Sequence, residues 1–199
     1  LEFRRVLFRS TFASALRSIL RQDPDIVLIG EIRDAETARI ATEAALTGHL
    51  VLSTIHTNSA PATITRLIDM GIEPFLVSSA LACVISQRLV RRLNDKTKQK
   101  VSPGADLVSR LGITPAQAKK ITFYDPKPDP NIAGDTGYSG RLAVHEVMMV
   151  DDDISRLIIE GADVAKIRDQ AIANGMSPLT LDGVCCIGLG MTSSEERSE

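Results

Sequence analysis

The stretch DPDIVLIGEIRD, Asp23–Asp34, decides the fold because it joins a short apolar run directly to a carboxylate. The run IVLI occupies Ile26–Ile29, and Gly30 and Glu31 follow it at once. A short run rich in β-branched residues and without polar positions predicts a strand buried on both faces, as in a parallel sheet covered by helices. The strand therefore delivers Glu31 from its carboxyl end.

Helical patterns and a second strand surround this run. Apolar residues recur at helical spacing over 12–20, ahead of the first strand. Asp34 is the predicted N-cap of a second helix, and Gly48 is placed to end it. The segment HLVLSTI, His49–Ile55, is a predicted strand, and a third helix is expected over 59–71. Strands alternating with helices predict an α/β fold with a mostly parallel sheet.

The remainder of the chain predicts further helices, with two strands among polar loops. Cys83 falls in the apolar part of the first of these helices and is expected to be a core residue. The acidic run Asp151–Asp153 suggests a cation site, but it fits better as a helix N-terminus that opposes the macrodipole. The expected elements are a helix over about 73–93, a polar loop from 94, a short helix from 114, strands over 121–124 and 141–150, and helices over 151–160 and 163–174.

Composition excludes several classes of protein. The 199 residues carry a net charge of -2, which gives no global electrostatic reason for binding nucleic acid or an anionic membrane. No apolar run approaches the roughly 20 residues that span a bilayer. The cysteines form no CxxC pair, which is typical of a chain from a reducing compartment. These features predict a cytoplasmic protein without direct membrane insertion.

Glu31 is the strongest candidate for chemistry. Ligands of parallel α/β sheets bind at the carboxyl ends of the strands. A carboxylate at that edge can hold Mg²⁺ or orient a water as general base, and Gly30 removes side-chain bulk beside it. The alternative is an ordinary acidic residue at the start of a loop, and spacing alone does not separate the two.

Two long motifs, LRSILRQDPDIVLIGEIRD at 16–34 and TGHLVLSTIHTN at 47–58, follow one another along the chain. They resemble the Walker B region and the His box of the hexameric P-loop ATPases that drive type II secretion and type IV pilus assembly. Later segments match as well, namely QRLVRRL, GYSGR, EVM and the GM…DG pattern. The resemblance runs from Thr11 to the C-terminus and weakens after Asn94. It implies part of a RecA-like core with a mostly parallel sheet, followed by a small, mostly helical C-terminal subdomain.

The resemblance also implies roles for individual residues. Glu31 matches the catalytic glutamate that polarises the attacking water, and Gly30 belongs to the same motif. His49 and His56 match the two His-box histidines, and His56 would lie near the γ-phosphate or a subunit interface. Together Gly30, Glu31, His49 and His56 form the expected nucleotide site. Arg33 is interpreted as structural or interfacial rather than catalytic. Without the family, His49 would be interpreted as a structural residue bonded to a nearby carbonyl.

ATP, Mg²⁺ and several partners follow from the same resemblance. The expected partners are sister subunits in a homohexamer and an inner-membrane platform protein, with no nucleic acid. The protein would then lie at the inner membrane through its partners. Pilus assembly, secretion and pilus retraction share these motifs, so the sequence does not separate them.

The sequence departs from the family in two places. No G-x-x-x-x-G-K-[ST] and no Gly-Lys pair occurs, so the main phosphate-binding loop is missing. Relatives carry two CxxC pairs for zinc, whereas RLNDKTKQK and NIAGDTGYSGR contain no cysteine, and no metal is expected. The first departure leaves a second reading, a non-catalytic assembly or docking module. As half of an ATPase core, the chain would expose strand edges and apolar surface.

These comparisons divide the chain into four segments. Residues 1–10 are an unmatched segment, for which an artefactual origin is one interpretation, and 11–95 are the C-terminal half of the core. Residues 96–140 are a polar insert at the place of the zinc subdomain. Residues 141–199 are a C-terminal strand and helices.

Overall fold

The structure, a computed structural model, describes residues 12–102, 108–109 and 114–198, so the expected unmatched segment 1–10 lies outside the described residues. Two compact units emerge from the contacts, and each is built from two separate stretches of sequence. Unit 1 comprises 1–84 with 147–176, and unit 2 comprises 85–146 with 177–199. The contiguous segments expected from sequence therefore differ from the grouping in space, because helices near the C-terminus share a core with the first 84 residues.

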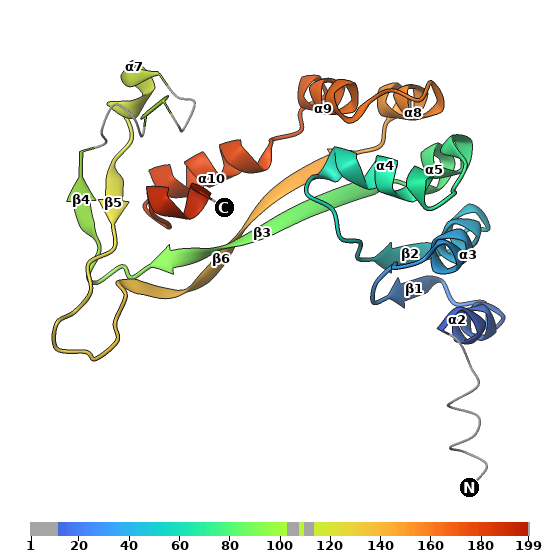
Figure 1. The fold of residues 1–199 in the computed structure, drawn as a ribbon, viewed down its shortest axis with the longest axis horizontal. Coiled ribbons are helices and arrows are strands. Elements are labelled where there is room, and N and C mark those ends of the chain that lie inside the picture. The colour runs from blue at the N-terminus through green and yellow to red at the C-terminus, as the bar shows by residue number, and fades with distance from the viewer. Residues whose placement is uncertain (1–11, 103–107, 110–113, 199) are drawn as a thin grey trace, which may run out of the picture. The chain divides into compact units, whose positions relative to one another are not determined.

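Unit 1 contains the predicted alternation of strands and helices (Figure 1). Its helices begin where capping side chains are available, as at Asp34 and Ser59. The acidic run after Val150 is confirmed as a helix start, with Asp151 as the N-cap. The elements are α2 (Phe12–Leu20), β1 (Ile26–Ile29), α3 (Ala35–Leu46), β2 (Leu50–Ser53), α4 (Ala60–Asp69), α5 (Pro74–Ala80), α8 (Asp152–Ile159) and α9 (Val164–Ala173).

Strands β1 and β2 form a parallel pair in register from Ile26↔Leu50 to Ile29↔Ser53. Side chains of α2 and α3 pack on one face, where Val27 and Ile29 are buried. The other face is open, with Leu28 77% exposed and Ile26 60% exposed. The expectation of burial on both faces is therefore wrong for this chain, because no described helix covers the second face. The expected exposure of apolar surface is confirmed.

A second core in unit 1 joins α4, α5, α8 and α9. Ile64 of α4, Val77 of α5, Ile154 of α8 and Ile167 of α9 are almost fully buried in one cluster. Helices α5 and α8 pack together, and α9 packs on both α8 and α4. The two helices expected near the C-terminus are thus confirmed, and they support the helix that follows β2.

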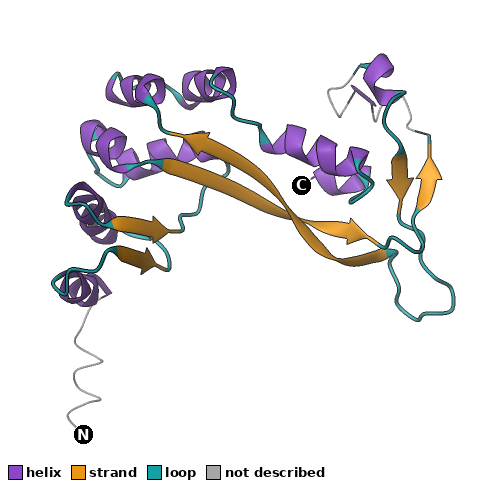
Figure 2. Cartoon of the chain, turned by 180° about the vertical axis from the view of Figure 1, so that it is seen from behind, coloured by secondary structure: helices purple, strands orange, loops and turns teal. Residues whose placement is uncertain are grey.

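The expected long helix over 73–93 is wrong. Helix α5 ends at Ala80, Leu81 is extended, and β3 (Cys83–Leu93) follows. β3 pairs with β6 (Tyr138–Met149) in a long two-stranded ribbon, in which the strands run in opposite directions (Figure 2). Pairing with a distant strand overrides a locally helical pattern, and the β-branched residues of β3 suit a strand. Cys83 is half-buried in this strand rather than a helix core residue.

Unit 2 has a small core of its own. The antiparallel pair β4 (Gln99–Val101) and β5 (Phe123–Asp125) lies within it, and β4 corrects the expectation of a plain polar loop after Asn94. Helix α7 (Pro115–Ala118) and the strand at β5 are confirmed, whereas α10 (Leu179–Gly188) and the 3₁₀ turn η1 (Ser194–Ser198) were not expected. Phe123, Val184 and Ile187 form the core. Among the described helices, none has the length and apolar character of a bilayer-spanning segment.

Candidate functional site

The carboxyl ends of β1 and β2 are tied together beyond their last paired residues. The Ile32 N–H donates to the Thr54 carbonyl at 2.9 Å, and the Thr54 hydroxyl donates to the Gly30 carbonyl at 2.7 Å. The chain therefore leaves both strands at one edge, with Glu31 on one segment and His56 on the other. A Cβ built on Gly30 meets no atom within 4 Å, so relief of side-chain bulk is not what requires glycine here.

Glu31 is contacted through both of its carboxylate oxygens. The Arg33 Nε donates to Oε2 at 2.6 Å, and the Arg33 Nη2 also lies 2.6 Å from that oxygen. The His56 Nε2 lies 2.7 Å from Oε1. The Glu31 side chain is 18% exposed, whereas Arg33 is 79% and His56 91% exposed. The carboxylate is thus the anchored group, and its two partners reach it from solvent.

The two oxygens of Glu31 differ in their hydrogen bonding. Oε2 accepts an aligned hydrogen bond from Arg33. Oε1 is buried and accepts no well-aligned hydrogen bond from the described residues, although His56 is close. The His56 ring is therefore close to Oε1 without an aligned hydrogen bond, and this contact is an ion pair only when the ring is protonated. A buried oxygen with unused acceptor capacity is suited to receive a proton from a water molecule.

A pocket of about 280 Å³ opens at this edge. Its lining combines the acidic and basic groups with two aliphatic side chains. Arg66 of α4 belongs to the lining and was missed by the sequence reasoning. Arg66 is three residues after Thr63 and so lies on the same face of α4. The Thr63 hydroxyl lies 2.9 Å from the hydroxyl of Thr57, the residue that follows His56. The lining residues are Glu31, Ile32, Arg33, Ile55, His56 and Arg66.

His49 is placed away from this pocket. It lies just before β2, whereas His56 follows the other end of that strand, and the four intervening strand residues span roughly 13 Å. Its Nδ1 lies 3.1 Å from the Ala44 carbonyl and 3.2 Å from the Thr47 hydroxyl, so the ring contacts the C-terminal end of α3. Its Nε2 is buried without a hydrogen-bond partner among the described residues. The structure therefore brings Gly30, Glu31 and His56 together, but not His49.

Asp34 fixes the direction of the segment that carries Glu31 and Arg33. Its Oδ1 accepts from the Thr37 N–H at 2.8 Å and its Oδ2 from the Thr37 hydroxyl at 3.0 Å. These hydrogen bonds, the backbone one foremost, lower the pKa of the Asp34 carboxyl below its usual value. Asp34 is thus confirmed as the N-cap of α3, and it remains charged at neutral pH.

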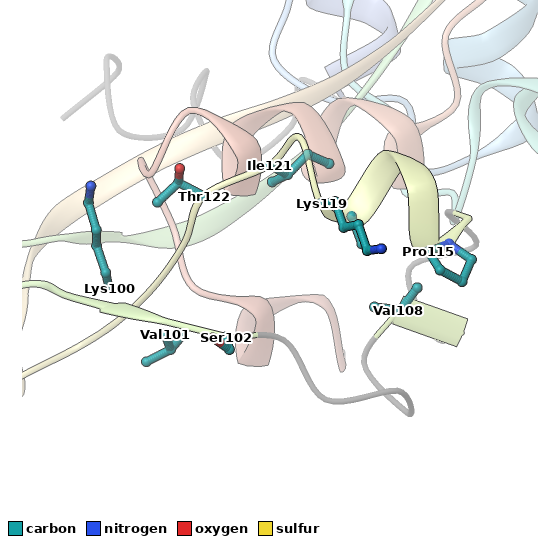
Figure 3. A pocket seen from close by; sticks show the side chains of 9 residues that line it. Lys100, Val101, Ser102, Val108, Pro115, Lys119, Ile121 and Thr122 are labelled. Atoms are coloured by element: carbon teal, nitrogen blue, oxygen red, sulfur yellow. The ribbon is translucent and has the colours of Figure 1, made fainter.

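A larger pocket, of about 640 Å³, lies in unit 2 (Figure 3). Lys100 and Lys119 contribute to its lining, but none of the lining residues that the structure describes is a carboxylate or a histidine. These described residues therefore do not supply the acid–base pair that the Glu31 pocket contains. Among the described residues, no three His, Cys, Asp or Glu side chains gather in a group that could hold a metal ion.

Comparison with curated proteins points to secretion and pilus motors. The chain is 50% identical over 186 residues to a type IV pilus assembly ATPase of Thermus thermophilus, covering 94% of this chain and 21% of that protein. It is 49% identical over 187 residues to the corresponding ATPase of Myxococcus xanthus, covering 93% and 33%. A type II secretion system protein E of Klebsiella pneumoniae is 51% identical over 160 residues, covering 80% and 31%. The chain thus spans about a fifth to a third of the length of these relatives.

Solved structures and a family match agree with these relatives. The pilus retraction motor PilT with bound ADP superposes with a TM-score of 0.64 at 27% identity, covering 95% of this chain and 43% of that one. The DotB ATPase of Legionella pneumophila superposes equally well, at 0.64, with 23% identity over 94% of this chain and 41% of that one, which supports the fold alone. Residues 7–198 match the family described as Type II/IV secretion system protein. The chain therefore belongs to the Type II/IV secretion system protein family, with the RecA-like fold of the secretion ATPases.

Proposed function

We propose that this chain is the C-terminal part of an ATPase that powers type IV pilus assembly or type II protein secretion. The named relatives support the choice of machine. The single observation that carries the proposal is the Glu31 pocket, where an anchored carboxylate and His56 meet at the carboxyl edge of a parallel strand pair. In this proposal DPDIVLIGEIRD is the Walker B segment and the stretch around His49 and His56 is the His box.

Glu31 and His56 have distinct roles in this reaction. The Oε1 atom of Glu31 orients a water molecule and accepts its proton, since that oxygen is buried and has no aligned donor. His56 is adjacent to the same oxygen and exposed, so it responds to whatever occupies the pocket. Mg²⁺-bound ATP would supply the phosphoryl group and the positive charge that stabilises its oxygens. Gly30 belongs to the same nucleotide site, whereas His49 supports it from the far end of β2.

The proposal extends to assembly and location. Sister subunits in a homohexamer and an inner-membrane platform protein are the proposed partners, and no nucleic acid is involved. The protein would act in the cytoplasm, at the inner membrane through these partners. No zinc takes part.

A second candidate function is a non-catalytic assembly or docking module. Two observations favour it: the sequence has no Gly-Lys pair for a phosphate-binding loop, and one face of the β1–β2 pair exposes Ile26 and Leu28. In this case the chain binds sister subunits or the platform but turns over no ATP.

Turnover by a chimera separates the two candidates. The matched residues of this chain replace the equivalent segment of the Thermus pilus assembly ATPase, and phosphate release is measured. We expect turnover with Glu31 and a loss of about 10²- to 10⁴-fold in Glu31→Gln, the usual contribution of a general base. Glu36→Gln is the matched control, because Glu36 is an exposed carboxylate on α3 that pairs with Arg17 outside the pocket. Unchanged turnover in Glu31→Gln would refute the catalytic role.

A further inference from the structure

A tight turn after β3 fixes the position of Lys98 in unit 2. The Asn94 carbonyl accepts the N–H groups of Thr97 at 3.1 Å and Lys98 at 2.9 Å. The Asn94 side-chain oxygen accepts the Lys96 N–H at 3.1 Å, and such a hydrogen bond from an asparagine to its own backbone two residues on favours a turn. Local hydrogen bonds therefore set where the Lys98 side chain begins.

The Lys98 ammonium contacts three separate parts of unit 2. Its Nζ donates to Asp95 Oδ1 at 2.7 Å within the turn, and to the Gly190 carbonyl at 2.8 Å, 92 positions further along the chain. It also lies 4.9 Å from the centre of the Tyr124 ring of β5, within the range of a cation–π interaction. The turn, β5 and the segment after α10 therefore meet at one positive charge.

The surroundings of the ammonium are close-packed at Gly190. This glycine has a φ of 66°, and an added Cβ would lie 2.8 Å from Tyr124 Cδ2 and 3.4 Å from Lys98 Nζ. Both the backbone conformation and the available space therefore require glycine here. The Lys98 side chain is only 18% exposed, so its contacts are less weakened by water than those of a surface lysine.

Unit 2 has a physical need for such a cross-link. The core cluster described there is small and is formed by Phe123, Val184 and Ile187. A small apolar core stabilises a domain weakly, and small domains are commonly reinforced by disulfides or metal ions. Lys98 lies within residues 92–100, the first of the two stretches that lack the expected zinc-binding cysteines. An ammonium has three donors, so it can join several acceptors as a bound metal ion joins several ligands.

We propose that the Lys98 ammonium is the structural cation of unit 2, and that it joins the turn, β5 and the segment after α10 in place of a metal ion. This role goes beyond the proposed ATPase function and does not depend on it. The competing explanation is an ordinary surface pair between Lys98 and Asp95, which contributes little to stability. A surface pair would have no effect on the segment that contains Gly190.

The cross-link also requires lysine rather than any cation. A guanidinium is planar and larger than an ammonium, and the space between the Tyr124 ring and Gly190 is already filled. Lys98→Arg should therefore fail to replace Lys98, although it retains the charge. Lys98→Met removes the charge and keeps most of the apolar stem.

Amide hydrogen exchange of the full chain, measured residue by residue by NMR, tests the proposal. The reporters are the N–H of Leu93, which donates to the Met191 carbonyl at 2.9 Å, and the N–H of Met191 itself. We expect both to exchange roughly 10- to 100-fold faster in Lys98→Met, as for the loss of a hydrogen bond to a charged group, while amides of unit 1 are unchanged. Lys96→Met is the matched control, because Lys96 is an exposed lysine of the same turn and lies outside the contacts of Lys98.

Three outcomes would overturn the proposal. Equal exchange in Lys98→Met and Lys96→Met would show that Lys98 does not hold the C-terminal segment, and full protection in Lys98→Arg would show that any cation suffices. Stoichiometric zinc in the unmodified chain would assign the cross-link to a metal. If Lys98→Met does not fold, Asp95→Asn removes one partner of the ammonium and should give a smaller acceleration at the same two amides, so unchanged exchange there would equally refute the cross-link.

Discussion

Replacing Asp151 with alanine should destabilise unit 1 by about 2 kcal/mol. Asp151 is the N-cap of α8, and its Oδ1 accepts from the Ile154 N–H at 3.0 Å. Loss of such a cap costs about 1 kcal/mol. The Asn174 side chain donates to Oδ2 at 2.7 Å, which ties the start of α8 to the end of α9, and this hydrogen bond contributes about another 1 kcal/mol.

The assay is thermal and urea unfolding followed by circular dichroism. For a chain of this size, a loss of about 2 kcal/mol lowers the Tm by about 4–8 °C. Asp152→Ala is the control, because Asp152 lies in the same first turn but its contribution is limited to a few tenths of a kcal/mol through the macrodipole. Equal losses in the two variants would refute the reasoning, since the effect would then follow from charge rather than from the cap.

The same cap has a defined dependence on pH. The backbone hydrogen bond from Ile154 is the main cause that lowers the pKa of the Asp151 carboxyl in the folded protein. A lowered folded pKa means that the stabilisation is complete above the ordinary aspartate pKa of about 3.9 and is lost as the pH falls through the folded pKa. The difference in stability between the unmodified chain and Asp151→Ala should therefore shrink in acid and persist at neutral pH.

Two further predictions concern unit 2. Gly137→Ala should lower stability more than Gly134→Ala. Both glycines have positive φ, but only at Gly137 would an added Cβ lie 2.6 Å from the Lys127 backbone nitrogen. Equal urea midpoints for the two variants would contradict this reasoning. Removal of metal by EDTA should leave the Tm unchanged, with zinc well below one ion per chain by elemental analysis. Residues 92–100 and 131–141, which stand at the places expected for zinc-binding cysteines, contain no thiol. Burial also raises the pKa of Cys186, which disfavours its thiolate, so stoichiometric zinc would contradict this expectation.

Local signals in the sequence were enough to predict most of unit 1. The run Ile26–Ile29, the caps Asp34 and Asp151, and the helix-ending Gly71 act within a few residues of themselves, so pattern and capping chemistry identify them. The carboxyl edge that carries Glu31 follows from the same logic, because a parallel strand must end there.

The misplaced helix over 73–93 shows where local signals stop. The predicted start near residue 73 is confirmed, since α5 begins at Pro74. What ends α5 and makes β3 is the pairing with β6, whose first residue, Tyr138, lies some 45 positions after Leu93. Local sequence also does not reveal whether one or both faces of the β1–β2 pair are covered. Leu28 is as apolar as Val27, and only the packing of α2 and α3 against one face distinguishes them.

In the candidate site, too, the local pattern predicts one residue, whereas the others depend on how distant segments pack. Glu31 is predictable because only Gly30 separates it from the end of β1. Its side chain is 18% exposed, which makes it the anchored member of the site. Its partners Arg33 and His56 reach it from two loop segments, and Arg66 lines the pocket from a helix. Which side chains line the pocket therefore depends on their direction rather than on the strand pattern. Exposed ion pairs of this kind contribute only about 0–1 kcal/mol, so Arg33 and His56 can leave the carboxylate at little cost. A carboxylate anchored at the strand edge, with exposed partners that are weakly held, is therefore an arrangement that an incoming ligand can reorganise without disturbing the strands that place it.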